Sequence, residues 1–86
     1  MLWDTLLDIA ALLGTNRCTF YRSAFHFDLG SGDWTLAVTP DSVGRIRIET
    51  CHFGRTVATR WCRAADAERI GVMVRESRDE VTAAEV

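Results

Sequence analysis

The segment from Cys18 to Cys62 constrains the fold most, because four runs within it alternate apolar and polar residues. Strict alternation with a period of two is typical of half-buried strands that keep one face in water. Gly30-Ser31-Gly32, Pro40-Asp41-Ser42 and Phe53-Gly54 separate the runs and are typical of turns. The segment therefore predicts a four-stranded antiparallel meander, with strands over residues 19–29, 33–40, 44–52 and 55–62.

The turns also predict the register of the strands. A two-residue loop at Phe53-Gly54 places Ile46 opposite Trp61 on the apolar face of the sheet. The polar face then carries a row across the strands that consists of His26, Ala37, Arg47 and Arg60. A slip of one residue moves every side chain of a strand to the other face, so the register decides which residues are exposed.

One helix is predicted on either side of the meander, over residues 2–13 and 63–81, and residues 82–86 are expected to fray. Apolar residues recur at helical spacing in both segments, and Gly14 follows the first helix as a typical terminator. Both helices are expected to cover the apolar face of the sheet. Residues 1–86 are thus predicted to form a single α+β domain, a two-layer sandwich of the order α-β-β-β-β-α.

The apolar surface of the first helix is wider than one packing face needs. Trp3 and Leu7 lie beside the central stripe that Leu6, Ile9 and Leu13 form. Contact with the second helix is one explanation of the excess, and contact with a partner protein or with a second copy, as a homodimer, is the other. Exposed apolar patches often mark interfaces, so Trp3 and Leu7 are candidate partner-binding residues.

Charge is distributed unevenly along the 86 residues, whose net charge is -2. Residues 17–63 carry +3, whereas residues 1–16 carry -2 and residues 64–86 carry -3. Every basic residue is Arg. The pattern predicts a basic sheet with acidic helices.

The basic side chains gather on the polar face of the sheet in the predicted register. Arg47 directly opposite Arg60 is an unfavourable pair unless an anion neutralises it. Glu49 and Asp28 within the sheet are one source of negative charge, and a phosphate or the carboxylates of a partner are another. The candidate partner-binding residues on this face are Arg22, His26, Arg45, Arg47 and Arg60.

Other chemistry finds little support in the sequence. The spacing of the three Cys and two His residues matches no zinc template, and the predicted register keeps Cys51 and Cys62 too far apart for a disulfide. Cys51 and His52 point to opposite faces of one strand and so cannot form a nucleophile–base pair. We therefore expect three free thiols, no metal, no cofactor and no enzymatic activity.

The predicted location is the cytoplasm. No segment is apolar over the length that spans a bilayer. The start, Met1-Leu2-Trp3, lacks the basic residues of a signal peptide and is followed by Asp4.

Two functions fit these features. The first is a small non-catalytic regulator or inhibitor that binds another protein, for example a phage- or mobile-element-encoded inhibitor of a nucleic-acid-processing complex, of the anti-CRISPR type. The alternative is a nucleic-acid-binding protein that uses the Arg-rich face of the sheet. The negative net charge and the lack of aromatic residues interleaved with the Arg residues favour the first.

Overall fold

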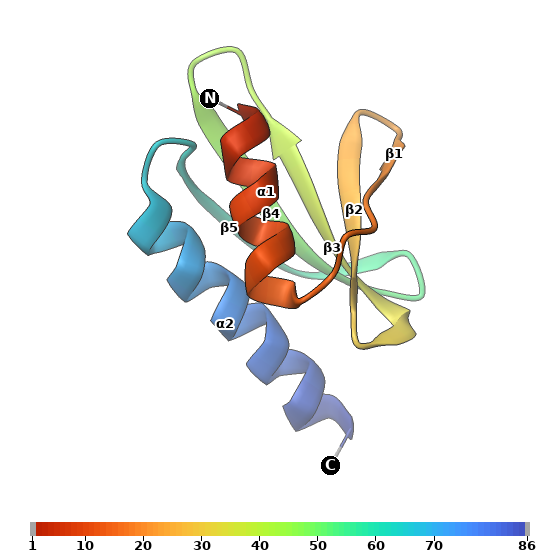
Figure 1. Ribbon diagram of the computed structural model, residues 1–86. Helices are drawn as coiled ribbons and strands as arrows, with labels where there is room; N and C mark the ends of the chain where they lie inside the picture. Colours follow the sequence, from red (N-terminus) through yellow and green to blue (C-terminus); the bar gives the residue numbers. More distant parts are fainter. Residues whose placement is uncertain (1, 86) are drawn as a thin grey trace.

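The computed structural model describes residues 2–85 as an α+β sandwich, in which two helices pack on one face of an antiparallel sheet (Figure 1). The sheet has five strands in the order β1-β2-β3-β4-β5, so each strand pairs with its neighbour in sequence. The elements are α1 (Leu2–Leu13), β1 (Thr19–Tyr21), β2 (Ala24–Leu29), β3 (Ser31–Pro40), β4 (Arg45–His52), β5 (Arg55–Arg63) and α2 (Ala67–Glu85). The predicted sandwich and its element order are confirmed, with one strand more than expected.

The additional strand arises because a hairpin divides the predicted strand over residues 19–29. Tyr21 pairs with Ala24, and Arg22 and Ser23 form the turn between them, with φ angles of 51° and 64°. Two-residue hairpins favour left-handed backbone, but Gly or Asn usually supplies it. Arg-Ser carries no such signal, so no turn was predicted here.

The register between β2 and β3 follows the predicted row, because His26 pairs with Ala37. The pairing of β3 with β4 is shifted by two residues from the predicted register, because Ala37 pairs with Glu49 and not with Arg47. A shift of two residues leaves every side chain of β4 on its predicted face.

A β-bulge shifts β5 by one residue. Cys51 pairs with Thr56 and Thr50 pairs with Ala58, so Val57 has no partner on β4. Beyond the bulge, every side chain of β5 lies on the face opposite to the one predicted. We call the helix-covered side of the sheet the inner face and the other side the outer face.

The bulge exchanges the environments of Arg60 and Trp61. Ile46 pairs with Cys62 where the sequence predicted Trp61. Trp61, which was predicted to be in the core, lies on the outer face and is 48% exposed. Arg60, which was predicted on the outer face, points toward α2.

The second helix begins and ends later than the predicted range of 63–81. It begins at Ala67 because β5 extends to Arg63 and because Asp66 caps the helix. The Asp66 carboxylate accepts a hydrogen bond from the backbone N–H of Arg69 at 3.0 Å. At its other end α2 continues to Glu85, and buried Val81 holds its last turns against the core.

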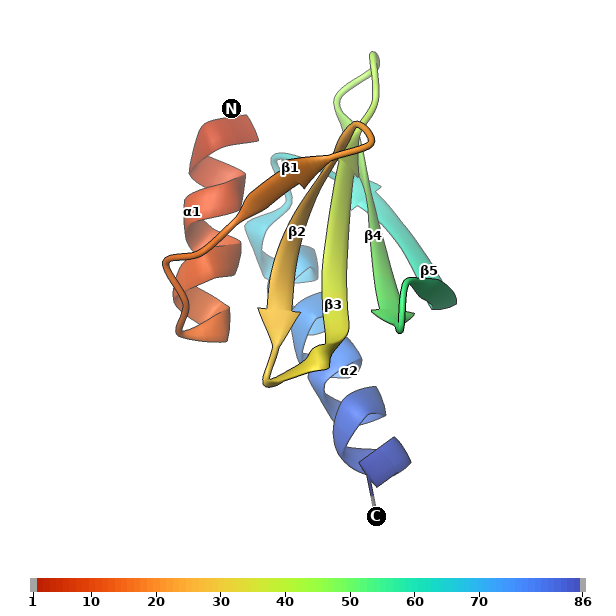
Figure 2. The same ribbon diagram turned by 90° about the vertical axis from the view of Figure 1, so that its right-hand side faces the viewer.

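The core lies between the inner face and the two helices, and Figure 2 shows α1 standing on one side of the twisted sheet. Hydrophobic side chains from both helices and from strands β2 to β4 fill it. The buried members are Leu6, Ile9, Phe27, Leu29, Trp34, Leu36, Val38, Ile46, Ile48, Ile70, Met73, Val74 and Val81. Within residues 2–85, neither helix combines the length and the apolar character needed to cross a membrane.

Candidate functional site

Arg60 is a structural residue in this fold and not part of an exposed basic row. Its Nη1 donates a hydrogen bond to Glu80 Oε1 at 2.8 Å, and its Nε lies 3.6 Å from Glu76 Oε2. The hydrogen bond to Glu80 is the main reason that the pKa of Arg60 lies above its ordinary value, although burial opposes it. Arg60 thus fastens β5 to α2, and the prediction that places it on the outer face is wrong.

Arg47 lies on the outer face as predicted, but it meets an acid of its own chain. Its Nε is 2.9 Å from Glu49 Oε1, next along β4 on the same face. The contact is a charge pair, because the Nε hydrogen finds no acceptor at hydrogen-bond geometry. Glu49 therefore supplies the internal counterion that the sequence left as one alternative.

Trp61 brings together a basic cluster that the sequence did not predict. The Arg45 guanidinium carbon lies 5.2 Å from the centroid of the Trp61 ring, and that of Arg47 lies 5.5 Å from it. Both distances are within the range of cation–π attraction. Arg63 is exposed on the same face and pairs directly with Arg45 across the strands. We call Arg45, Arg47, Trp61 and Arg63 the Trp61 patch.

The charges of the Trp61 patch are only partly balanced. Arg45 Nε lies 2.8 Å from Asp41 Oδ2. Slight desolvation raises the pKa of Asp41, but hydrogen bonds from Arg45 and Val43 outweigh this effect and hold that pKa below its ordinary value. Arg63 has no acidic partner among residues 2–85. The like-charge pair that was predicted for Arg47 and Arg60 therefore exists between Arg45 and Arg63.

Arg22 and His26 lie toward the opposite edge of the sheet, where β1 and β2 pair. The Arg22 guanidinium carbon is 5.2 Å from the centroid of the Tyr21 ring, and His26 Nε2 is 3.1 Å from the Tyr21 carbonyl oxygen. Both residues line a shallow hollow of 430 Å³ on the outer face, to which Arg47 also contributes. Of the predicted residues, Arg22 and His26 thus lie at this hollow, Arg45 belongs to the Trp61 patch and Arg47 contributes to both, whereas Arg60 belongs to neither.

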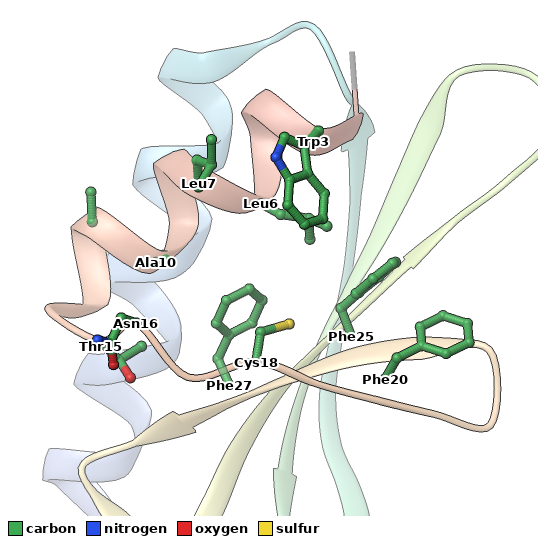
Figure 3. A pocket seen from close by; sticks show the side chains of 11 residues that line it. Trp3, Leu6, Leu7, Ala10, Thr15, Asn16, Cys18, Phe20, Phe25 and Phe27 are labelled. Atoms are coloured by element: carbon green, nitrogen blue, oxygen red, sulfur yellow. The ribbon is translucent and has the colours of Figure 1, made fainter.

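A second surface feature is an apolar groove between α1 and the strands β1 and β2 (Figure 3). Its volume is 480 Å³, which falls within the range of small-molecule sites. Figure 3 shows the ring of Trp3 descending from α1 and the rings of Phe25 and Phe27 pointing toward it from β2. The groove is lined by Trp3, Leu6, Leu7, Ala10, Ala11, Thr15, Asn16, Cys18, Phe20, Phe25 and Phe27.

Trp3 and Leu7 are exposed beside this groove, at 69% and 55%. The second helix contacts α1 but does not cover these two side chains. Phe20 on the opposite wall is also exposed. The explanation that the second helix covers these two side chains is therefore wrong, and contact with another molecule stays a prediction.

The three cysteines are free and lie in different surroundings. Burial raises the pKa of all three thiols, and the carboxylates of Glu49 and Asp66 add to the effect at Cys51 and Cys62. Within residues 2–85 no group of three or more His, Cys, Asp or Glu side chains is arranged to hold a metal ion.

The raised thiol pKa values predict a loss of stability at alkaline pH. A thiol with a raised pKa in the folded state ionises first in the unfolded chain, so stability is complete below the ordinary thiol pKa and falls as pH rises above it. Urea unfolding at pH 7 and pH 10 measures the loss. Because the chain contains no Lys, a variant with Ser at positions 18, 51 and 62 is expected to lose clearly less stability than the wild type. An equal loss in both proteins would contradict the assignment to the thiols.

Comparison of the chain with protein-family models, with curated proteins and with solved structures finds no match. A functional proposal therefore depends on the residues and their geometry.

Proposed function

We propose that this chain is a non-catalytic, cytoplasmic regulator or inhibitor that acts by binding another protein. The observation that carries the proposal is the apolar groove, with exposed Trp3, Leu7 and Phe20 on its walls. One concrete form of such a regulator is a phage- or mobile-element-encoded inhibitor of a nucleic-acid-processing complex, of the anti-CRISPR type.

The groove suits a protein partner for two physical reasons. Its lining is apolar and contains no charged side chain, so an apolar segment of a partner would be desolvated there without leaving a charge unpaired. Exposed aromatic residues around a concave centre are also typical of the residues that dominate binding energy at interfaces. Trp3 is the side chain from which we expect the largest contribution.

The test uses a double variant, Trp3→Ser/Leu7→Ser, and a matched control, Val43→Ser. Val43 is an apolar residue that is 71% exposed in the turn between β3 and β4, and it does not line the groove. A partner is captured from a nuclease-treated lysate of the source cells, purified, and titrated by calorimetry. We expect the double variant to bind at least about 10-fold more weakly than the wild type, and the control to be unchanged. Equal affinity of all three proteins would refute the groove as the binding surface.

Light scattering distinguishes a different protein from a second copy in the groove. A monomer at all concentrations supports a heterologous partner. A dimer that the double variant abolishes would assign the groove to a homodimer formed through α1.

Nucleic-acid binding is the second candidate, and the Trp61 patch favours it. An exposed ring between guanidinium groups is a feature on which a base stacks while the Arg residues bind phosphates. In the predicted register Trp61 lies in the core, so no such aromatic residue was expected among the Arg residues of the outer face. The negative net charge still ranks it second.

A further inference from the structure

The strand β5 forms a free edge of the sheet. It is the last strand in the sheet order, and none of its nine residues is buried. Within residues 2–85 no strand pairs with the edge of β5 that faces away from β4. An edge of this length presents backbone N–H and C=O groups with which another extended chain can pair. Proteins often block such edges with Lys, Pro or a bulge. β5 contains neither Lys nor Pro, and its bulge lies near its beginning, so residues 58–63 form a regular edge.

The Trp61 patch adjoins this free edge. Trp61 and Arg63 belong to β5 itself, and Arg45 and Arg47 lie on the neighbouring strand. Arg63 and Arg45 are opposite one another, and a like-charge pair is unfavourable unless an anion lies close by. Asp41 balances Arg45 but leaves Arg63 without an acid in the described chain. The Arg residue without a counterion thus lies on the same strand whose backbone groups are unpaired on one side.

We propose that an extended, acidic segment of a partner protein adds to β5 as a sixth strand. Its backbone would pair with the free edge of β5, and alternate side chains would lie on the outer face. Acidic side chains at those positions would contact Arg63 directly and Arg45 across it, through charge-assisted hydrogen bonds. Apolar side chains among them would cover the exposed ring of Trp61. This inference depends on the proposed function only in requiring a protein partner, and it concerns a surface separate from the groove.

The same observations favour a peptide strand over a nucleic acid. Two of the three guanidinium groups already have carboxylate partners, so the patch has one Arg without a counterion, which suits a single acidic side chain better than a row of phosphates. A nucleic acid would also leave the backbone groups of the β5 edge unpaired, whereas a peptide strand satisfies them.

The test uses an eight-residue peptide that alternates Glu and Val, and a counterpart that alternates Lys and Val. Both are titrated into the full chain labelled with nitrogen-15, and amide shifts and hydrogen exchange are recorded. We expect the acidic peptide to shift the amides of β5 and to slow exchange at those that point away from β4. The basic peptide should bind at least about 10-fold more weakly.

Charge reversal provides the matched variants. Arg45→Glu/Arg63→Glu should invert the preference, so that the basic peptide binds better than the acidic one. Arg17→Glu/Arg75→Glu changes the net charge equally at exposed positions away from β5 and should leave binding within about 3-fold of the wild type.

The proposal would be overturned if the acidic peptide at millimolar concentration left the β5 amides unchanged, or if both charge-reversal variants lost binding equally. A ten-residue oligothymidylate is titrated as well. If it bound the Trp61 patch tightly and with a steep salt dependence, the patch would be a nucleic-acid site instead. The result is independent of the groove, because every protein in this experiment retains Trp3 and Leu7. If the peptide titration fails, the Trp3→Ser/Leu7→Ser variant still tests the proposed function. If the groove variant fails, the peptide titration still tests strand addition to β5.

Discussion

Replacement of Trp34 by Ala is expected to lower the free energy of unfolding by about 3–5 kcal/mol, and the same replacement of Trp61 by at most about 1 kcal/mol. Trp34 is 6% exposed in the core and stacks on His52, with ring centroids 4.0 Å apart. Its removal leaves a large cavity under the sheet. Trp61 stands on the outer face, where its loss removes mainly its contacts with two Arg side chains.

Urea unfolding followed by far-ultraviolet circular dichroism measures both effects without depending on Trp fluorescence. A domain of 86 residues has only a few kcal/mol of stability to lose, so Trp34→Ala should be largely unfolded in buffer. Trp34→Phe is the control, because it keeps an aromatic ring in the core and should lose less. A loss at Trp61 as large as that at Trp34 would show that Trp61 lies on the inner face, as the sequence had predicted.

The contrast between these two residues shows why the sequence predicted the fold better than the surface. Alternation of apolar and polar residues identified the strands, and it placed β2 and β3 in the correct register through His26 and Ala37. The positions of the strands and the register of β2 with β3 each depend on many residues at once. The bulge at Val57 depends on one, and no turn residue or change of pattern marks it. Because β5 follows the bulge, a single unpaired residue was enough to exchange its two faces.

The candidate site was predicted in part for the same reason. Helical periodicity placed Trp3 and Leu7 beside the central stripe of α1 but left open whether the second helix covers them, and the structure shows both exposed. The Trp61 patch was missed because it depends on the face of β5. A signal was present in α2, where Glu76 and Glu80 lie one turn apart. Two acids at that spacing repel one another, so on a helix that packs on a sheet they need a cation, and Arg60 is the one that reaches them.

Replacement of Arg60 by Met is the second change for which we expect a large effect, a loss of about 1–3 kcal/mol in the free energy of unfolding. The Arg60 side chain is 18% exposed, so solvent replaces its interactions only in part. The carboxylate of Glu80 also lies 3.2 Å from Thr50 Oγ1, whose oxygen is 2.8 Å from that of Ser77. Without the guanidinium, this polar cluster between the sheet and α2 would keep an uncompensated negative charge.

Arg63→Met is the matched control, because Arg63 belongs to the same strand but points to the outer face without an acidic partner in the described chain. It should change stability by less than about 0.5 kcal/mol. The variant Arg60→Met/Glu80→Gln should recover part of the loss, since it removes the charge that Arg60→Met leaves behind. Urea unfolding of the wild type, Arg60→Met, Glu80→Gln and the double variant gives the coupling between Arg60 and Glu80. Equal losses for Arg60→Met and Arg63→Met would mean that both side chains lie in water. In that case β5 would not be shifted by the bulge, and the Trp61 patch would not exist.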